Sequence, residues 1–80
     1  MRLAEFTEFL VKSVVKDPES VSVKGFETEE GIVIEVLVSE DDMGAVIGRG
    51  GTIATSIRTL VRASAYISNE PKVKINIDSI

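Results

Sequence analysis

A glycine-rich turn between two helical segments constrains this chain more than any other stretch of its sequence. Residues 46–51 read Val-Ile-Gly-Arg-Gly-Gly, with an apolar helical pattern on either side. Glycine has no Cβ, so the chain can turn tightly here and another molecule can approach its backbone. The helix that follows points its free N–H groups and the positive end of its dipole at the turn. Arg49 at the tip adds a cation, so the pattern predicts a helix–loop–helix unit able to hold a phosphate.

The Gly-x-x-Gly spacing alone also fits a simple turn, and its surroundings decide what it can bind. A Walker A loop requires a lysine and then Ser or Thr after its last glycine, but Gly51 is followed by Thr52 and Ile53. A dinucleotide-binding turn requires a third glycine where Ile53 stands. Both motifs are excluded, whereas the strand patterns upstream and downstream of the loop favour contact with a nucleic acid.

Hydrophobic periodicity predicts six elements along the chain. A first helix of about four turns carries its apolar face on Leu3, Phe6, Leu10 and Val14, and the proline at position 18 ends it. Strands are expected over 21–24, 32–38 and 73–77, and helices over 40–47 and 52–66. The order α-β-β-α-α-β predicts an α+β fold with a three-stranded mixed sheet and the helices packed on one face. Its third strand runs parallel to the second, and residues 1–80 form a single domain.

Several local features refine this prediction. Gly25 indicates a β-bulge, because the next residue falls on the opposite parity from the apolar residues before it. Ser39 and Asp42 have the spacing of a capping box at the start of a helix. The three acids at 40–42 are expected to complement the helix dipole rather than to hold a metal. Residues 69–71, Asn-Glu-Pro, predict a turn.

Composition narrows the classes of function. The chain has no cysteine and no histidine, which excludes thiolate metal sites and a cysteine nucleophile and removes the commonest general base. No dispersed acid–base constellation replaces them, so an enzyme is not expected, and no cofactor or metal is implied. No apolar run approaches the ~20 residues of a membrane span. These features predict a cytoplasmic binding protein without a membrane partner.

Charge is divided unevenly along the sequence. The net charge of the chain is −4, made up of −7 over residues 1–42 and +3 over residues 43–80. Between positions 43 and 69 there are three arginines and no acid. The predicted loop therefore lies in the basic part of an acidic protein, and local positive potential is what an RNA-binding surface requires.

These residues resemble a known family. An Ile-Gly-x-x-Gly sequence between two short helices is the signature of the K-homology (KH) domain, which reads single-stranded RNA. The stretches 42–44, 46–51, 52–54 and 57–59 are similar to those of the small bacterial single-domain KH proteins of the KhpA family. The resemblance covers the whole chain. It implies the type II KH fold and a role as a post-transcriptional regulator or RNA chaperone.

The resemblance also implies where RNA lies. About four unpaired nucleotides would occupy a groove between the two central helices and the second strand. Ile47 would form its floor, and Ile34 and Val36 would line its other wall, with core packing expected for at least one of these two strand residues. The expected RNA-binding residues are Val46, Ile47, Gly48, Arg49, Gly50, Gly51, Thr52 and Arg58. Gly50 stands where the family often has a polar or cationic residue, so only one loop cation is available.

Three positions leave two interpretations open. Arg58 and Arg62 lie four apart on one face of a helix, which suits either RNA contact or a solvated charged face. Gly44 inside a helix suits close helix packing or nucleotide approach. Leu60 is either buried in the monomer or a dimer contact. A dimer contact would suit the alternative function, a protein–protein adaptor, because KhpA-like proteins associate with themselves and with a larger KH-containing partner (KhpB, also called Jag or EloR).

Overall fold

The computed structural model describes residues 2–70 and 72–80, and in these residues the six predicted elements occur in the predicted order. The helices are α1 (Arg2–Lys12), α2 (Met43–Ile47) and α3 (Thr52–Ile67), and the strands are β1 (Ser22–Thr28), β2 (Gly31–Val38) and β3 (Val73–Ser79). Three short 3₁₀ turns join them: η1 (Pro18–Ser20), η2 (Glu40–Asp42) and η3 (Arg49–Gly51). The turn predicted at 69–71 includes Pro71, which lies outside the described residues.

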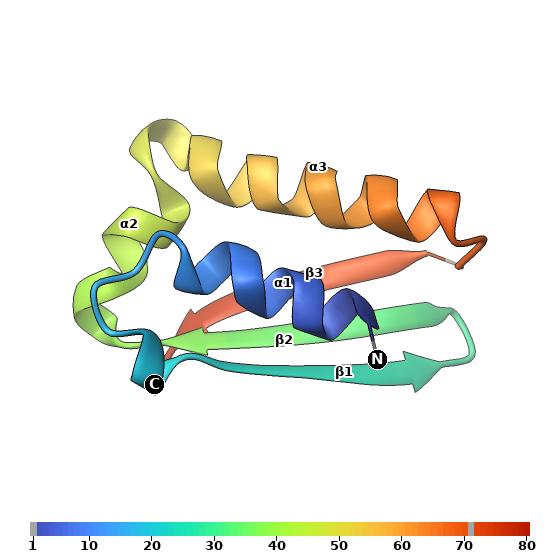
Figure 1. The fold of residues 1–80 in the computed structure, drawn as a ribbon, viewed down its shortest axis with the longest axis horizontal. Helices are drawn as coiled ribbons and strands as arrows, with labels where there is room; N and C mark the ends of the chain where they lie inside the picture. The colour runs from blue at the N-terminus through green and yellow to red at the C-terminus, as the bar shows by residue number, and fades with distance from the viewer. Residues whose placement is uncertain (1, 71) are drawn as a thin grey trace.

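The strands form one mixed sheet in the order β1-β2-β3 (Figure 1). β1 and β2 pair antiparallel as a hairpin, and β2 pairs parallel with β3. Gly31 begins β2 with φ +145°, and a Cβ there would collide with the backbone carbonyl of Lys72. This close approach lets the Ile32 N–H donate to the Lys72 carbonyl at 2.7 Å, which starts the parallel pairing.

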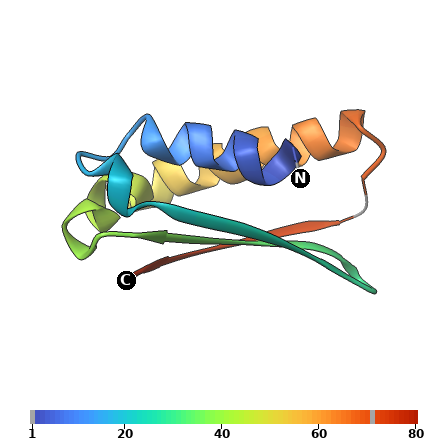
Figure 2. The same ribbon diagram turned by 60° about the horizontal axis from the view of Figure 1, so that its bottom comes forward.

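All three helices cover the same face of the sheet, as expected (Figure 2). The strands alternate, so that one side chain in two points into the layer between sheet and helices. The helices supply the opposite wall of that core. Its members are mostly β-branched: Leu3, Val11, Val21, Ile32, Ile34, Val36, Val38, Val46, Ile57, Val61, Ala65, Val73 and Ile75. No helix of the described residues lies on the opposite face of the sheet.

The first helix is shorter than predicted and buries a different stripe. It ends at Lys12 rather than near Asp17, and its buried residues are Leu3, Thr7 and Val11. Thr7 tolerates burial because its hydroxyl donates to the Leu3 carbonyl at 2.7 Å. A competing partner accounts for the early end. The backbone N–H groups of Lys16 and Asp17, which a longer helix would bind internally, donate to the Asp42 carboxylate at 3.0 Å each.

Two local predictions are wrong. Gly25 makes no bulge, because the register of β1 against β2 is unbroken and Gly25 pairs with Ile34. The parity change at Phe26 instead places that ring on the uncovered face of the sheet, where it is 46% exposed. Ser39 and Asp42 make no capping box, since the Ser39 side chain makes no cap bond and donates to Asp42 Oδ2 at 3.1 Å.

Asp42 is therefore a structural anchor. It is buried, and its carboxylate accepts from two backbone N–H groups after α1 and from the Ser39 hydroxyl. The hydrogen bond from the Lys16 backbone N–H lowers the pKa of Asp42 below its usual value. The Asp17 backbone N–H and the Ser39 hydroxyl lower it further, and burial opposes them. The ionised Asp42 carboxylate therefore holds the segment that follows α1 against the segment that precedes α2.

Candidate nucleic-acid interface

The loop between α2 and α3 has a backbone that glycine must supply. Gly48, Gly50 and Gly51 have φ values of +77°, +65° and +79°, in the region that side chains other than glycine rarely adopt. Arg49 is the one loop residue outside this region. Glycine at position 50, which departs from the family pattern, therefore has a conformational reason in this chain.

The three glycines differ in what surrounds them. A Cβ on Gly48 would lie 2.9 Å from the Cβ of Ile53, so Gly48 is required for Ile53 to pack beneath the loop. A Cβ on Gly50 or Gly51 would meet no atom within 4 Å. The backbone of the last two glycines is thus open to an approaching ligand.

The loop lies at the N-terminus of α3, and no side chain caps that end. Gly51 occupies the N-cap position without a side-chain hydrogen bond. The Thr52 hydroxyl donates to the Arg49 carbonyl at 3.0 Å, and contact of Thr52 with RNA stays a prediction. The Arg49 side chain is exposed. The N–H groups of Gly51 and Thr52 donate to the Gly48 and Arg49 carbonyls. The positive end of the α3 dipole and the exposed guanidinium of Arg49 together give this end of the molecule the character of an anion site.

The apolar residues before the loop divide into two roles. Val46 is fully buried and belongs to the core, so it offers no surface to a ligand. Ile47 is half-buried and packs at the end of α2, directly before the loop. Of the expected pair, Ile47 alone can form the floor of a groove.

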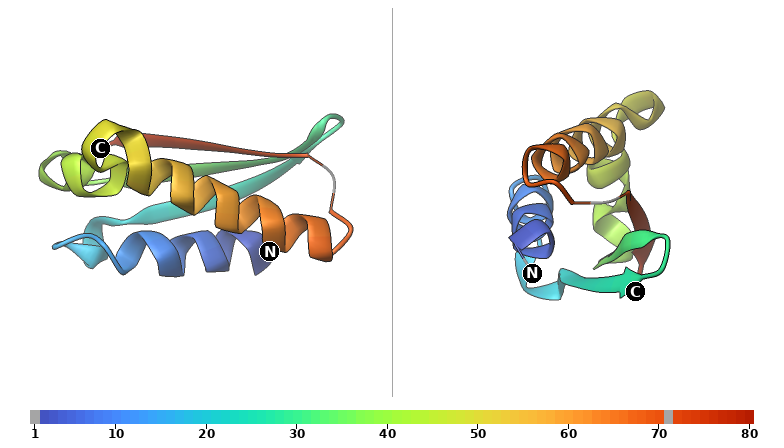
Figure 3. Two further views of the ribbon diagram at one scale, coloured as in Figure 1. Left: turned by 90° about the horizontal axis from the view of Figure 1, so that it is seen from above. Right: turned by 90° about the vertical axis from the view of Figure 1, so that its right-hand side faces the viewer.

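The expected wall on the second strand is wrong. Ile34 and Val36 are 0% and 1% exposed, and β2 is paired on both sides. A central strand has no free backbone groups and no free side chains on its covered face. The edge strands are β1 and β3, and β3 is the one that lies beside α3 (Figure 3).

Arg58 and Arg62 lie along this edge of β3 rather than beside the loop. Arg58 Nε donates to the Ile75 carbonyl and Arg62 Nε donates to the Val73 carbonyl, both at 3.3 Å. Their spacing of four residues places both on the side of α3 that faces β3. They are more than a solvated charged face, since they bridge helix and strand while remaining partly accessible to solvent. Their contact with RNA stays a prediction.

Two further residues, Tyr66 and Lys72, extend the row formed by Arg58 and Arg62, and the sequence did not predict them as site residues. A hollow of about 250 Å³ lies at the far end of α3, lined by Arg62, Ala65, Tyr66, Glu70, Lys72 and Val73. The sequence signal was the spacing of Arg58, Arg62 and Tyr66 at four-residue steps. Lys72 could not be placed by spacing, because the turn before β3 determines its position.

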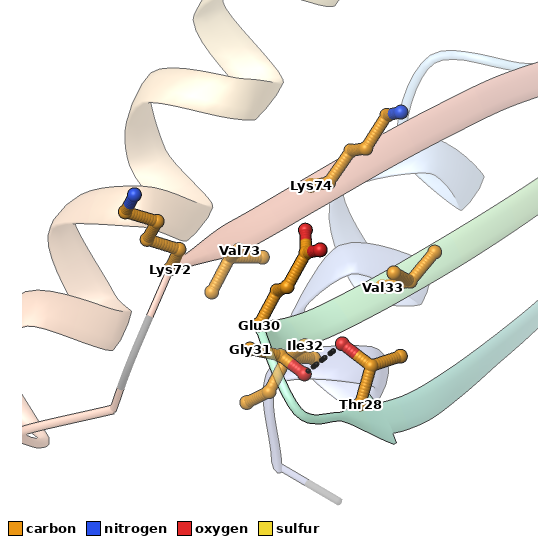
Figure 4. Close-up of a pocket in the computed structure, with 8 residues that line it drawn as sticks. All are labelled: Thr28, Glu30, Gly31, Ile32, Val33, Lys72, Val73 and Lys74. Atoms are coloured by element: carbon orange, nitrogen blue, oxygen red, sulfur yellow. Dashed lines mark hydrogen bonds between the residues drawn. The ribbon is translucent and has the colours of Figure 1, made fainter.

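A second hollow, of about 280 Å³, lies where the β1–β2 hairpin meets the start of β3. Figure 4 shows Lys74 on this strand and Lys72 just before it, with Lys72 directed toward α3. The Thr28 hydroxyl donates to the Gly31 carbonyl at 3.0 Å and closes the hairpin end. Lys72 places positive charge at the end of the groove opposite the loop. Lys74 lies on the uncovered face of the sheet, because its neighbours Val73 and Ile75 point into the core.

Leu60 is not part of the core. It is 49% exposed on α3. Ile67, which lies further along α3 on the same side as Leu60, is also exposed. The interpretation that Leu60 is buried within the monomer is therefore wrong, and the side of α3 away from β3 presents apolar surface.

Comparison with known proteins decides the family. The family model of the KhpA/KhpB KH domain matches residues 4–77. The chain belongs to the KhpA/KhpB family of KH domains. A protein named RNA-binding protein KhpA from Clostridium perfringens is 45% identical over 75 residues, covering 94% of this chain and 99% of that relative. One of the same name from Borreliella burgdorferi is 41% identical over 73 residues, covering 91% of this chain and 88% of that protein.

Solved structures support the same fold for this KhpA/KhpB family member. A crystal structure of Era from Aquifex aeolicus bound to GDP.AlF4- superposes with a TM-score of 0.74 at 22% identity over 99% of this chain. Era in complex with MgGDPNP and nucleotides 1506-1542 of 16S ribosomal RNA gives a TM-score of 0.71 at 21% identity over 98% of this chain. The present chain spans about a third of each, 31% and 30%. The fold is the type II KH fold.

The search for membrane-spanning segments is negative for the helices of the described residues: none has both the length and the apolar character that a crossing would need.

Proposed function

We propose that this protein is a non-enzymatic, single-stranded RNA-binding module in which the loop at 48–51 holds the phosphates of about four nucleotides. One observation carries the proposal: the backbone of Gly50 and Gly51 is open and lies at the uncapped N-terminus of α3. The exposed Arg49 beside it supplies the cation. The name of the curated relatives, RNA-binding protein, agrees with this assignment.

The bases would follow the groove between α3 and the edge of β3. Ile47 forms the apolar floor next to the loop. Arg58 and Arg62 line the wall along the strand. Lys72 lies at the far end. This path replaces the one expected along the central strand, because β3 is the strand with unpaired backbone groups beside the helix.

The proposed role is that of a post-transcriptional regulator or RNA chaperone, acting in the cytoplasm as a single domain of residues 1–80. The chain has no histidine or cysteine to carry general-base or nucleophilic chemistry. A single loop cation limits the electrostatic contribution to affinity. Weak binding of short segments suits a protein that acts on many RNAs.

Replacing Arg49 and Gly50 by aspartate tests the loop. Two negative charges where phosphates lie should weaken binding to a single-stranded RNA oligonucleotide at least tenfold, as measured by fluorescence anisotropy. Because position 50 has φ +65°, both the test and its control need residues that tolerate this region, and Asp and Asn do so best.

The matched control is Arg49→Ser with Gly50→Asn, which keeps the backbone demand and adds no negative charge. It should bind RNA several-fold more tightly than the double aspartate variant, and both should keep the circular dichroism of the wild type. Equal affinity of wild type and the double aspartate variant would refute the proposed phosphate site.

An adaptor function is the second candidate, and the exposure of Leu60 favours it. Half-exposed Leu60 and exposed Ile67 give α3 an apolar strip on the side away from the proposed RNA groove. The partner would be a second copy of this chain or a larger KhpB-like protein, since one family model covers both kinds of KH domain. Pairing would add a second RNA site and raise overall affinity through effective concentration.

A further inference from the structure

Only every second residue of β3 directs its backbone N–H and C=O groups toward the open edge of the sheet. The N–H and C=O of a strand residue point to one side, and successive residues point to alternate sides. The Lys72 carbonyl accepts from Ile32 and therefore faces β2. Val73, Ile75 and Ile77 consequently direct their backbone groups away from the sheet.

Two of these outward carbonyls are already occupied. Ile75 accepts from Arg58 Nε, and Val73 accepts from Arg62 Nε. Arginine has five N–H donors and no acceptor, so each guanidinium keeps free donors beyond the bond it makes. Neither arginine forms an ion pair among the described residues. The two arginines thus occupy the carbonyl acceptors at this edge and present their remaining N–H donors in place of those acceptors.

The edge next to Arg58 is therefore rich in donors. A base that binds there must offer acceptors side by side. Guanine offers O6 and N7 together, whereas adenine offers N7 beside its N6 amino group. An adenine amino group would face the guanidinium donors and leave a donor without a partner, which is costly in a partly desolvated site.

We propose that the groove selects guanine over adenine at the nucleotide beside Arg58, through the O6 and N7 acceptors of the base. The inference rests on the proposed RNA-binding function and names the base class that this site reads. It applies to the Arg58 position rather than to the far end of the groove. There the Glu70 carboxylate shares the hollow with Arg62 and Lys72 and can accept from an amino group.

The test uses five-nucleotide RNAs with one central purine between uridines. Guanine should bind about five- to tenfold more tightly than adenine at the same salt concentration, which is the lower end of the range expected for one good bidentate contact. Inosine keeps O6 and N7 and should bind as guanine does. 7-Deazaguanine lacks the N7 acceptor and should fall toward the affinity of adenine.

Arg58→Lys assigns the effect to this residue. Lysine keeps the positive charge but loses the planar pair of donors, so the ratio of guanine to adenine affinity should fall toward one. Arg2→Lys on α1, the same exchange on another element, should leave the ratio unchanged.

The outcomes separate the inference from the function on which it rests. Equal binding of guanine and adenine by the wild type would overturn the inference and leave RNA binding intact. A guanine preference that survives in Arg58→Lys would overturn its assignment to Arg58. Binding of none of these RNAs would refute the proposed function itself.

Discussion

At the scale of single residues, glycines that look alike in the sequence do different work. Gly48 leaves room for the side chain of Ile53. Gly50 and Gly51 adopt positive φ values at positions where no other atom lies close to them. Gly44 has an ordinary helical conformation, and a Cβ there would touch nothing within 4 Å. Close helix packing therefore does not explain Gly44, and nucleotide approach is the interpretation that is left.

Gly48→Ala and Gly44→Ala form a matched pair. Gly48→Ala should lower the free energy of unfolding by about 1–3 kcal/mol, since the new methyl group is strained at φ +77° and meets Ile53. Gly44→Ala should raise it by about 0.5–1 kcal/mol through the lower entropy of the unfolded chain. Urea denaturation measures both.

A Gly48→Ala variant as stable as the wild type would contradict the packing argument. For Gly44→Ala the second measurement is RNA affinity. A gain in stability together with weaker binding would assign Gly44 to nucleotide approach, and unchanged binding would remove it from the interface.

The sequence predicted where the loop lies, but it could not show why each loop position requires glycine. The spacing of glycines indicates a turn, but φ values and the contact of Gly48 with Ile53 depend on how α3 packs. Val46 illustrates the same limit. An apolar residue before the loop suits a groove or the core equally well, and only the packing assigns Val46 to the core and Ile47 to the surface.

At the scale of elements, Asp42 joins two segments that are distant in sequence. Its carboxylate holds the backbone of Lys16 and Asp17, which are 26 and 25 residues away. Periodicity extended the first helix toward residue 17 because the apolar spacing continues. The sequence contains no local sign that a distant carboxylate will take those N–H groups, so the end of α1 was mispredicted while the elements themselves were found.

Acid should weaken this junction. Hydrogen bonds from the Lys16 and Asp17 backbone lower the pKa of Asp42 in the folded state below its usual value of 3.8. The stabilisation is therefore fully present above about pH 4 and is lost as the pH falls through the lowered pKa. Asp42→Asn should lower stability at pH 7 and reduce the loss of stability between about pH 4 and pH 2.

Chemical denaturation at pH 7 and at acid pH measures this effect. Asp41→Asn is the control, because Asp41 is the exposed neighbour on the same turn. It should keep the wild-type stability at pH 7. If Asp42→Asn and Asp41→Asn behave alike, Asp42 is not the anchor described.

At the scale of the whole molecule, α3 contributes to two different surfaces, one basic and one apolar. The side toward β3 carries Arg58 and Arg62, and the other side carries Leu60 and Ile67. The sequence predicted a basic zone around the loop. It could not show that Arg58 and Arg62 reach the backbone carbonyls of β3, because that arrangement depends on the parallel pairing of β3 with β2.

Leu60→Glu tests whether the apolar side of α3 is an interface. Since Leu60 is half-exposed, the variant should stay folded. It should weaken self-association at least tenfold and weaken binding to RNAs that carry two sites but not to those with one. Sedimentation velocity and circular dichroism measure these effects.

Leu37→Glu is the control for adding charge to an exposed apolar residue, since Leu37 is 39% exposed on the uncovered face of the sheet. It should leave self-association unchanged. A Leu60→Glu variant that remains dimeric would place the interface elsewhere, and a wild type that is monomeric at tens of micromolar would remove the support for an adaptor role.

The parallel pairing of β2 with β3 also has a consequence for synthesis of the protein. β1 and β2 are neighbours along the chain and can form their hairpin early, whereas β3 must pair across the whole stretch of α2, the loop and α3. Distant contacts of this kind form slowly. The proposed groove needs the edge of β3 as its wall, so a nascent chain that still lacks this strand has the loop but not the groove. Because RNA in the groove would bind only the completed fold, it would also stabilise that fold by mass action.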